Sequence, residues 1–261
     1  MSVYRVEPDD LMTAFGLGDL VAACDPVVGQ LVERFDLAGK TLMSVGAGCA
    51  HEEAALLRRG MRRALLFDID AESSIEPTLR RLHRPDRPQV PFVYVVADFL
   101  AAPPPGEDLD PIDLLYFSGF TPDELRRGEI SERHRRSARP HPSAGQHADP
   151  DWPAATSPVH DVVPLAVDRY LAEGGLFILQ SYTAGVDVLQ NPGYVSQWRD
   201  VLGRHRVALI EVYYFRAAPG VTLWIGVKQA AGVALADLTA RPPLTRFHAR
   251  AQLEDCSIAR L

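Results

Sequence analysis

The chain has 261 residues, enough for one large α/β domain or two small ones. Apolar residues make up 47% and charged residues 23%, which is typical of a globular protein with a sizeable hydrophobic core. The formal net charge is −7, which argues against a general nucleic-acid-binding protein, because such proteins usually carry a basic stripe. We therefore expect no nucleic-acid partner.

The cysteines Cys24, Cys49 and Cys256 are widely spaced, and no CxxC pair suggests a zinc site. The N-terminus lacks the basic region and apolar run of a signal peptide. No stretch approaches the roughly 20 apolar residues that span a membrane. We expect a cytoplasmic protein with no membrane partner and no metal.

Residues 1–38 mix polar and apolar side chains in a way that predicts helices. One helix is expected over 10–15. The apolar residues of 19–35 fit a helical stripe only if Pro26 lies near a helix start, because proline lacks the N–H that a helix interior uses. We expect this segment to form an N-terminal helical cap.

From residue 39 onward, apolar strands alternate with helices. The expected strands are 41–45, 64–67, 92–97, 112–117 and 176–180, and the expected helices are 51–60, 73–83, 158–171 and 192–204. Two further strands at 207–215 and 221–228 flank a short turn and predict an antiparallel hairpin. Apolar strands alternating with helices indicate a doubly wound α/β fold with a mostly parallel sheet covered on both faces.

Two segments interrupt this alternation, the insert at 119–157 and the tail at 230–261. The insert at 119–157 is rich in Arg, His, Pro and Ser, and a loop this long is usually either functional, here as a lid, or mobile. Its histidines and aspartates are irregularly spaced, so they predict no metal site. The remaining parts are the cap at 1–38, a domain at 39–229 and a tail at 230–261.

The first expected strand runs into a glycine-containing loop, MSVGAGCA at 43–50. Glycines let a backbone turn sharply and approach a ligand closely. The loop resembles the glycine-rich loop of class I S-adenosylmethionine (SAM)-dependent methyltransferases, which passes beneath the methionine part of SAM. The family usually has an acidic residue where Ser44 stands, so Glu52 or Glu53 would have to replace it, and often a third glycine at Ala50. The alternative is a tight turn that binds nothing.

Three acidic positions follow the order of the same family. Asp68 ends a strand 20 residues after Gly48, where a carboxylate would accept hydrogen bonds from ribose hydroxyls. Asp70 is the alternative candidate for this contact, and either aspartate could instead cap the next helix. The resemblance places Asp98 at the adenine amino group with Phe99 beside the ring, and it makes Asp113 structural.

The resemblance implies a seven-stranded sheet that closes with the hairpin. A dinucleotide-binding loop of the GxGxxG type would need a glycine at His51 and is not favoured. Ser118 and Tyr182 lie at the carboxyl ends of strands, where open α/β sheets bind ligands, and are the catalytic candidates. The implied SAM site comprises Ser44, Gly46, Ala47, Gly48, Asp68, Ile69, Asp98, Phe99 and Ser118.

The implied function is a SAM-dependent methyltransferase with a small-molecule acceptor. Methyl transfer from a sulfonium needs alignment more than acid–base help, so catalytic residues leave a weak signal in the sequence. Two alternatives stay open: transfer or cyclisation of the aminocarboxypropyl arm of SAM, as in nicotianamine-synthase-like enzymes, and a non-catalytic SAM-fold subunit. A homodimer is also left open.

Overall fold

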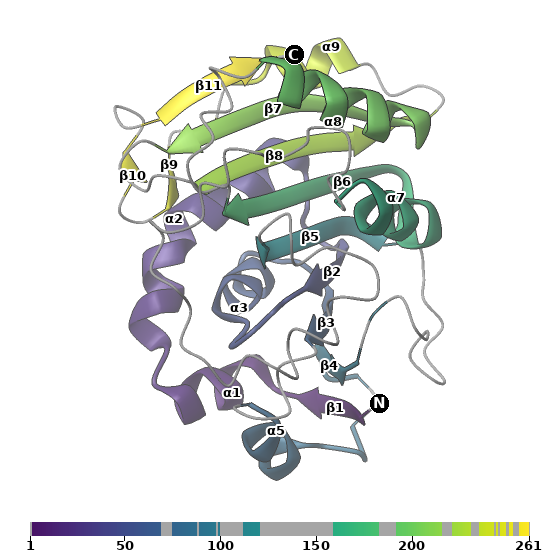
Figure 1. Cartoon of the computed structure of the whole chain (residues 1–261). Coiled ribbons are helices and arrows are strands. Elements are labelled where there is room, and N and C mark those ends of the chain that lie inside the picture. Colours follow the sequence, from purple (N-terminus) through teal and green to yellow (C-terminus); the bar gives the residue numbers. More distant parts are fainter. Residues whose placement is uncertain are drawn as a thin grey trace, which may run out of the picture. The chain divides into compact units, whose positions relative to one another are not determined.

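The computed structural model describes most of the chain, with gaps in several loops. The described residues are 2–68, 75–87, 89–97, 99, 112–120, 159–182, 192–215, 221–230, 235–242, 244, 246–248, 251–252 and 256–260. The chain forms two compact units. Figure 1 labels their helices and strands. The first is Met1–Tyr116 with Pro243–Arg250, and the second is Phe117–Pro242 with Ala251–Leu261.

The first unit is built on a sheet whose strands follow the order β1-β4-β3-β2. Strands β2, β3 and β4 are parallel neighbours, and all residues of β2 and β4 are buried, as expected of strands covered on both faces. The elements are β1 (Ser2–Val6), α1 (Pro8–Phe15), α2 (Gly18–Phe35), β2 (Thr41–Val45), α3 (His51–Arg58), β3 (Arg63–Asp68), α5 (Glu76–Leu82), β4 (Phe92–Val96), the start of β5 (Ile112–Phe120) and β9 (Arg246–His248).

The chain begins with a strand, which corrects the expectation that residues 1–38 are helical throughout. Strand β1 pairs antiparallel with β4, from Ser2 opposite Val96 to Val6 opposite Phe92. Tyr4 and Val6 are buried and the intervening Arg5 is half-buried, which is the two-residue alternation of a strand. The segment is too short for that alternation to stand out from the helical pattern that follows.

Helix α2 corrects the second expectation for this segment. It begins at Gly18 and continues through Pro26, which therefore lies inside the helix and not near its start. A proline inside a helix removes one backbone hydrogen bond and costs about 3 kcal/mol or more. Buried apolar side chains, each worth roughly 1.5–3 kcal/mol, offset this cost. They are Val21, Val27, Val28, Leu31 and Val32.

The second unit holds an antiparallel sheet with the strand order β6-β8-β7-β11. The predicted pairing of the last two strands is confirmed, since β7 and β8 pair antiparallel with a bulge between Leu209 and Glu211. The elements are α7 (Val159–Tyr170), β6 (Leu171–Tyr182), α8 (Pro192–Arg204), β7 (Val207–Phe215), β8 (Val221–Lys228), α9 (Leu235–Ala240), β10 (Ala251–Gln252) and β11 (Cys256–Arg260).

The predicted α/β class, with mostly parallel central strands and a closing antiparallel pair, is confirmed. Strands β1 and β11 were not among the expected seven; both join their neighbours antiparallel. The insert expected at 119–157 lies outside the described residues beyond the end of β5. No described helix has the length and apolar character needed to cross a membrane.

Candidate functional site

The loop between β2 and α3 adopts the sharply turned backbone that its glycines predict. Gly46, Gly48 and Ala50 all have positive φ angles, of 74°, 51° and 58°. The amides of Gly46 and Ala47 both donate to the carbonyl of Phe67, at 2.8 and 3.1 Å. A side chain in the left-handed region costs roughly 1–2 kcal/mol, which glycine avoids. Ala50 is held there without being a glycine, so the loop keeps its course despite the missing third glycine.

Asp68 at the end of β3 is tied directly to this loop. The amide of Gly48 donates to Asp68 Oδ2 at 2.7 Å, and Tyr94 on β4 donates its hydroxyl hydrogen to the carbonyl oxygen of Gly48 at 2.6 Å. Burial, and then the charge of Asp68, raise the pKa of Tyr94 well above its usual value, so its hydroxyl stays a donor. Both backbone groups of Gly48 are thus fixed by side chains from the two neighbouring strands.

Ser44 occupies the position where the resembled family has an acid, and an acid reaches it from α3. Its hydroxyl donates to Glu53 Oε1 at 2.5 Å, and both side chains are buried. Burial is the main cause that raises the pKa of Glu53 to about 8, and the charge of Glu52 adds to it. Glu53 is therefore the one of the two expected substitutes that meets Ser44.

Phe99, expected beside an adenine ring, is 4% exposed just after β4. Its ring packs edge-on against Phe67, with centroids 6.4 Å apart. Asp98, expected at the adenine amino group, and Ile69 lie outside the described residues, as does Asp70.

The two catalytic candidates lie in strands of the second unit. Ser118 is in β5 and Tyr182 is the last residue of β6, and their side chains are outside the description. Their proposed roles stay predictions. The structural role predicted for Asp113 is confirmed: its Oδ2 accepts the amide hydrogen of Thr41 at 2.8 Å, at the start of β2.

The structure thus gathers Ser44, Gly46, Ala47, Gly48 and Asp68 at one turn of the first unit. Sequence reasoning missed Tyr94, although a tyrosine within the apolar run FVYVV is a usable signal, because a buried hydroxyl needs a partner. It also missed Tyr116, whose hydroxyl donates to Glu52 Oε2.

Among known proteins, no protein-family model and no curated protein matches this sequence. Three solved structures with a similar fold serve as examples. A Streptococcus mutans protein provisionally named a SAM-dependent methyltransferase is 12% identical, with a TM-score of 0.44 over 75% of this chain and 46% of that one. Ribosomal protein L11 methylase from Lactobacillus delbrueckii subsp. bulgaricus is 17% identical, with a TM-score of 0.43 over 78% and 77%. The fibrillarin pre-rRNA processing protein of Methanococcus jannaschii is 9% identical, with a TM-score of 0.41 over 73% and 67%.

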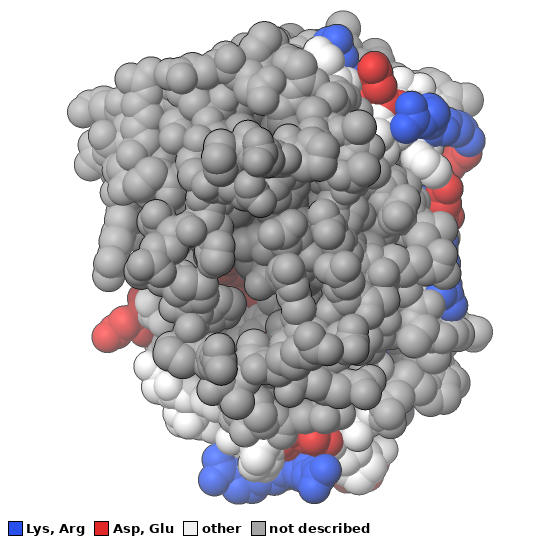
Figure 2. Space-filling model, viewed as in Figure 1, with Lys and Arg blue, Asp and Glu red and all other residues white. Residues whose placement is uncertain are grey.

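The prediction that excluded nucleic acid as a partner is contradicted by the pre-rRNA processing protein among these structures. The physical error is that a net charge is a sum and says nothing about where charges lie. Among the described residues coloured in Figure 2, acidic and basic side chains lie beside one another at the right edge and at the bottom of the view. This chain spans less than half of the Streptococcus mutans protein. At these identities the similarity is one of fold, so the chemistry has to be inferred from the chain's own residues.

Proposed function

We propose that this chain is a SAM-dependent methyltransferase. The observation that carries the proposal is the turn of Gly46 and Gly48: both have positive φ angles, the amide of Gly48 donates to the carboxylate of Asp68, and a Cβ added at Gly48 would meet nothing within 4 Å. A close-approach backbone next to an acid at the end of the second parallel strand suits a ligand that carries a ribose. Bound SAM would supply an activated methyl group on its sulfonium.

In this proposal, each residue of the loop region has a binding role. The backbone of 46–48 lies along the methionine arm, and Asp68 accepts hydrogen bonds from ribose hydroxyls. A carboxylate offers about four acceptor sites, so its bond from Gly48 is compatible with that role. Asp98 and Phe99 are proposed for the adenine, and Ser118 and Tyr182 for the acceptor side.

Glu53 is proposed to supply the acidic group that the family has at the position of Ser44. Its carboxyl is buried against the Ser44 hydroxyl, which holds it in place. Because its pKa is raised to about 8, Glu53 is mostly protonated at pH 7. A cationic amino group placed beside it would favour the ionised form, so binding should release a proton to the buffer.

The binding claim is tested by titrating SAM into the purified chain in a calorimeter. We expect Asp68→Ala to weaken SAM binding at least tenfold, about 1.4 kcal/mol. Asp86→Ala serves as the control, because Asp86 is exposed and lies in the turn between α5 and β4. Undetectable binding by the wild type, or equal affinities of the wild type and Asp68→Ala, would reject the proposal.

The reaction is tested by product analysis, because the alternative reactions convert SAM into different products. S-adenosylhomocysteine indicates methyl transfer, and methylthioadenosine indicates use of the aminocarboxypropyl arm. The acceptor assay pairs small molecules, the class suggested by the sequence, with RNA. Binding without turnover of any acceptor would favour a non-catalytic subunit.

The free thiols of Cys24 and Cys49 suit the proposed cytoplasmic location.

A further inference from the structure

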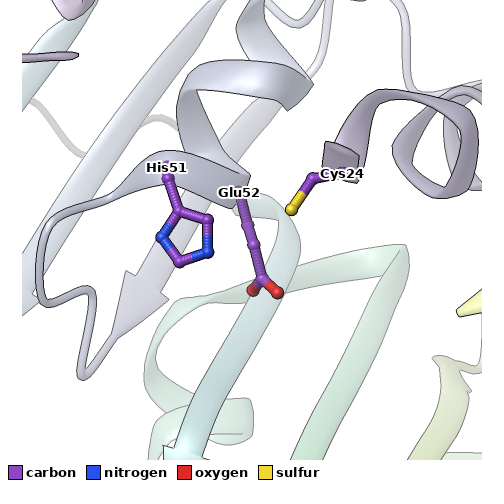
Figure 3. Close-up of side chains that lie close together, drawn as sticks. All are labelled: Cys24, His51 and Glu52. Carbon is purple, nitrogen blue, oxygen red and sulfur yellow. The ribbon is translucent and has the colours of Figure 1, made fainter. Parts of the chain in front are cut away.

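A second cluster of reactive side chains lies where α2 meets the first turn of α3. Cys24 comes from α2, and His51 and Glu52 open α3 (Figure 3). One thiol, one imidazole and one carboxylate ligand atom all lie within 4.8 Å of one another. All three side chains are half-buried. None of these three side chains is among the proposed SAM contacts.

The two helices that carry this cluster are held together next to it. Helices α2 and α3 pack against each other in the first unit. Asp25, the neighbour of Cys24, receives two hydrogen bonds from Arg59 at the end of α3, one of them from Nε at 2.7 Å. The Arg59 guanidinium also lies against Gly29, where an added Cβ would be 3.2 Å from its Cζ. The three side chains therefore project from a fixed frame.

We propose that Cys24, His51 and Glu52 bind a Zn²⁺ ion. Sulfur, imidazole nitrogen and carboxylate oxygen are the ligand types that zinc takes in proteins. On binding, the Cys24 thiol gives its proton to water and forms a zinc–sulfur bond. The thiolate and the Glu52 carboxylate then balance the two charges of the ion.

The geometry requires only a small closure of the cluster. Zinc bonds of about 2.0–2.3 Å in a tetrahedron place neighbouring ligand atoms roughly 3.5 Å apart. The three atoms already lie within 4.8 Å of one another, so the proposal requires shifts on the order of 1 Å. Three protein ligands leave a fourth position for water or a substrate atom, which is the arrangement of catalytic rather than structural zinc sites.

Tyr116 is the positioning residue of this site. Tyr116 lies in β5, and its hydroxyl donates to Glu52 Oε2. Ligating carboxylates in metal sites are commonly hydrogen-bonded in this way, and losing such a partner typically costs 10- to 100-fold in metal affinity. A carboxylate carries two oxygens, so this hydrogen bond is compatible with a zinc–oxygen bond.

The test uses the full chain after treatment with a chelator, titrated with Zn²⁺ in a calorimeter and with Co²⁺ in a spectrophotometer. We expect one Zn²⁺ per chain, and a thiolate-to-metal charge-transfer band with Co²⁺. Cys24→Ser should abolish that band, and Cys24→Ser, His51→Ala and Glu52→Gln should each weaken Zn²⁺ binding at least tenfold. Tyr116→Phe should weaken binding 10- to 100-fold and keep the band.

Cys49→Ser is the matched control, because Cys49 is a second half-buried free thiol near the same helix start and is outside the cluster. A band that survives Cys24→Ser, or one lost in Cys49→Ser, would overturn the site, as would a wild type that binds no Zn²⁺. If Cys24→Ser does not fold, the Zn²⁺ affinities of His51→Ala and Glu52→Gln decide, and wild-type affinity in both would overturn the site. SAM titrations of the same variants keep this outcome separate from that of the proposed function.

Discussion

The carboxyl of Glu53 favours its protonated form at neutral pH because it lies buried against the hydroxyl of Ser44. Its pKa is raised from 4.5 to about 8, first by burial and then by the charge of Glu52, and the hydroxyl of Ser44 only partly opposes this. Each pKa unit corresponds to about 1.4 kcal/mol of preference for the protonated form. The folded chain therefore holds this proton more tightly than the unfolded chain does.

This proton makes stability depend on pH in a stated direction. Between pH 4.5 and about 8 the unfolded chain has lost the Glu53 proton and the folded chain has kept it, so the free energy of unfolding falls as pH rises. The free energy of unfolding of the wild type should fall by a few kcal/mol across this window, and Glu53→Gln should abolish that fall. Urea unfolding at pH 5, 7 and 9 measures the effect, in the absence of SAM.

Glu33→Gln provides the comparison for this prediction, because Glu33 is an exposed carboxyl on α2. It should leave the pH profile of the wild type unchanged. A Glu53→Gln profile as steep as that of the wild type would show that the Glu53 pKa is not raised in the folded chain.

At the scale of single elements, β8 depends on a glycine for its place between its two neighbours. A Cβ added at Gly226 would lie 2.8 Å from Val207 Cγ1 and 3.1 Å from the carbonyl oxygen of Ala208. We expect Gly226→Ala to destabilise the fold by roughly 1–3 kcal/mol, because the backbone of β7 would have to move. Chemical denaturation measures the change.

Gly203 is the matched position for this substitution. It lies in α8, is exposed, and an added Cβ would meet nothing within 4 Å. Gly203→Ala should be neutral or stabilising by up to about 1 kcal/mol, because alanine favours helix more than glycine does. Equal effects of the two substitutions would refute the steric account of β8.

Helix α2 offers a prediction from its internal proline. Pro26 is exposed inside the helix, where it supplies no amide hydrogen. Pro26→Ala would restore one backbone hydrogen bond at some cost in unfolded-chain entropy, so we expect a net gain of about 1–2 kcal/mol in thermal or urea unfolding. A loss of stability would mean that the helix has adapted to the proline ring.

For the molecule as a whole, the predicted elements match the structure best where buried segments are long and regular. Helix 192–204 and the strands 41–45, 207–215 and 221–228 are confirmed with their bounds. The strand expected at 176–180 is longer, Leu171–Tyr182. At its C-terminal end, the ladder with β8 extends to Tyr182 opposite Val221. Strands β1 and β11 went unpredicted because each gains its stability from a partner remote in the chain.

The candidate SAM site divides in the same way. Gly46, Gly48 and Asp68 could be predicted, since a glycine turn after a strand and an acid after the next are local patterns. The hydrogen bonds around them could not, because Tyr94 reaches the loop across the sheet and the sequence did not decide which of Glu52 and Glu53 would meet Ser44.

Local pattern alone determined the α/β class, the order of most strands and helices, and the turn at Gly46 and Gly48. These depend on hydrophobic periodicity and backbone freedom, which are properties of neighbouring residues. Only the tertiary structure decided that Glu53 meets Ser44, and that Cys24 meets His51 and Glu52. The packing of helices on strands and on other helices sets such contacts, and no spacing along the chain encodes it.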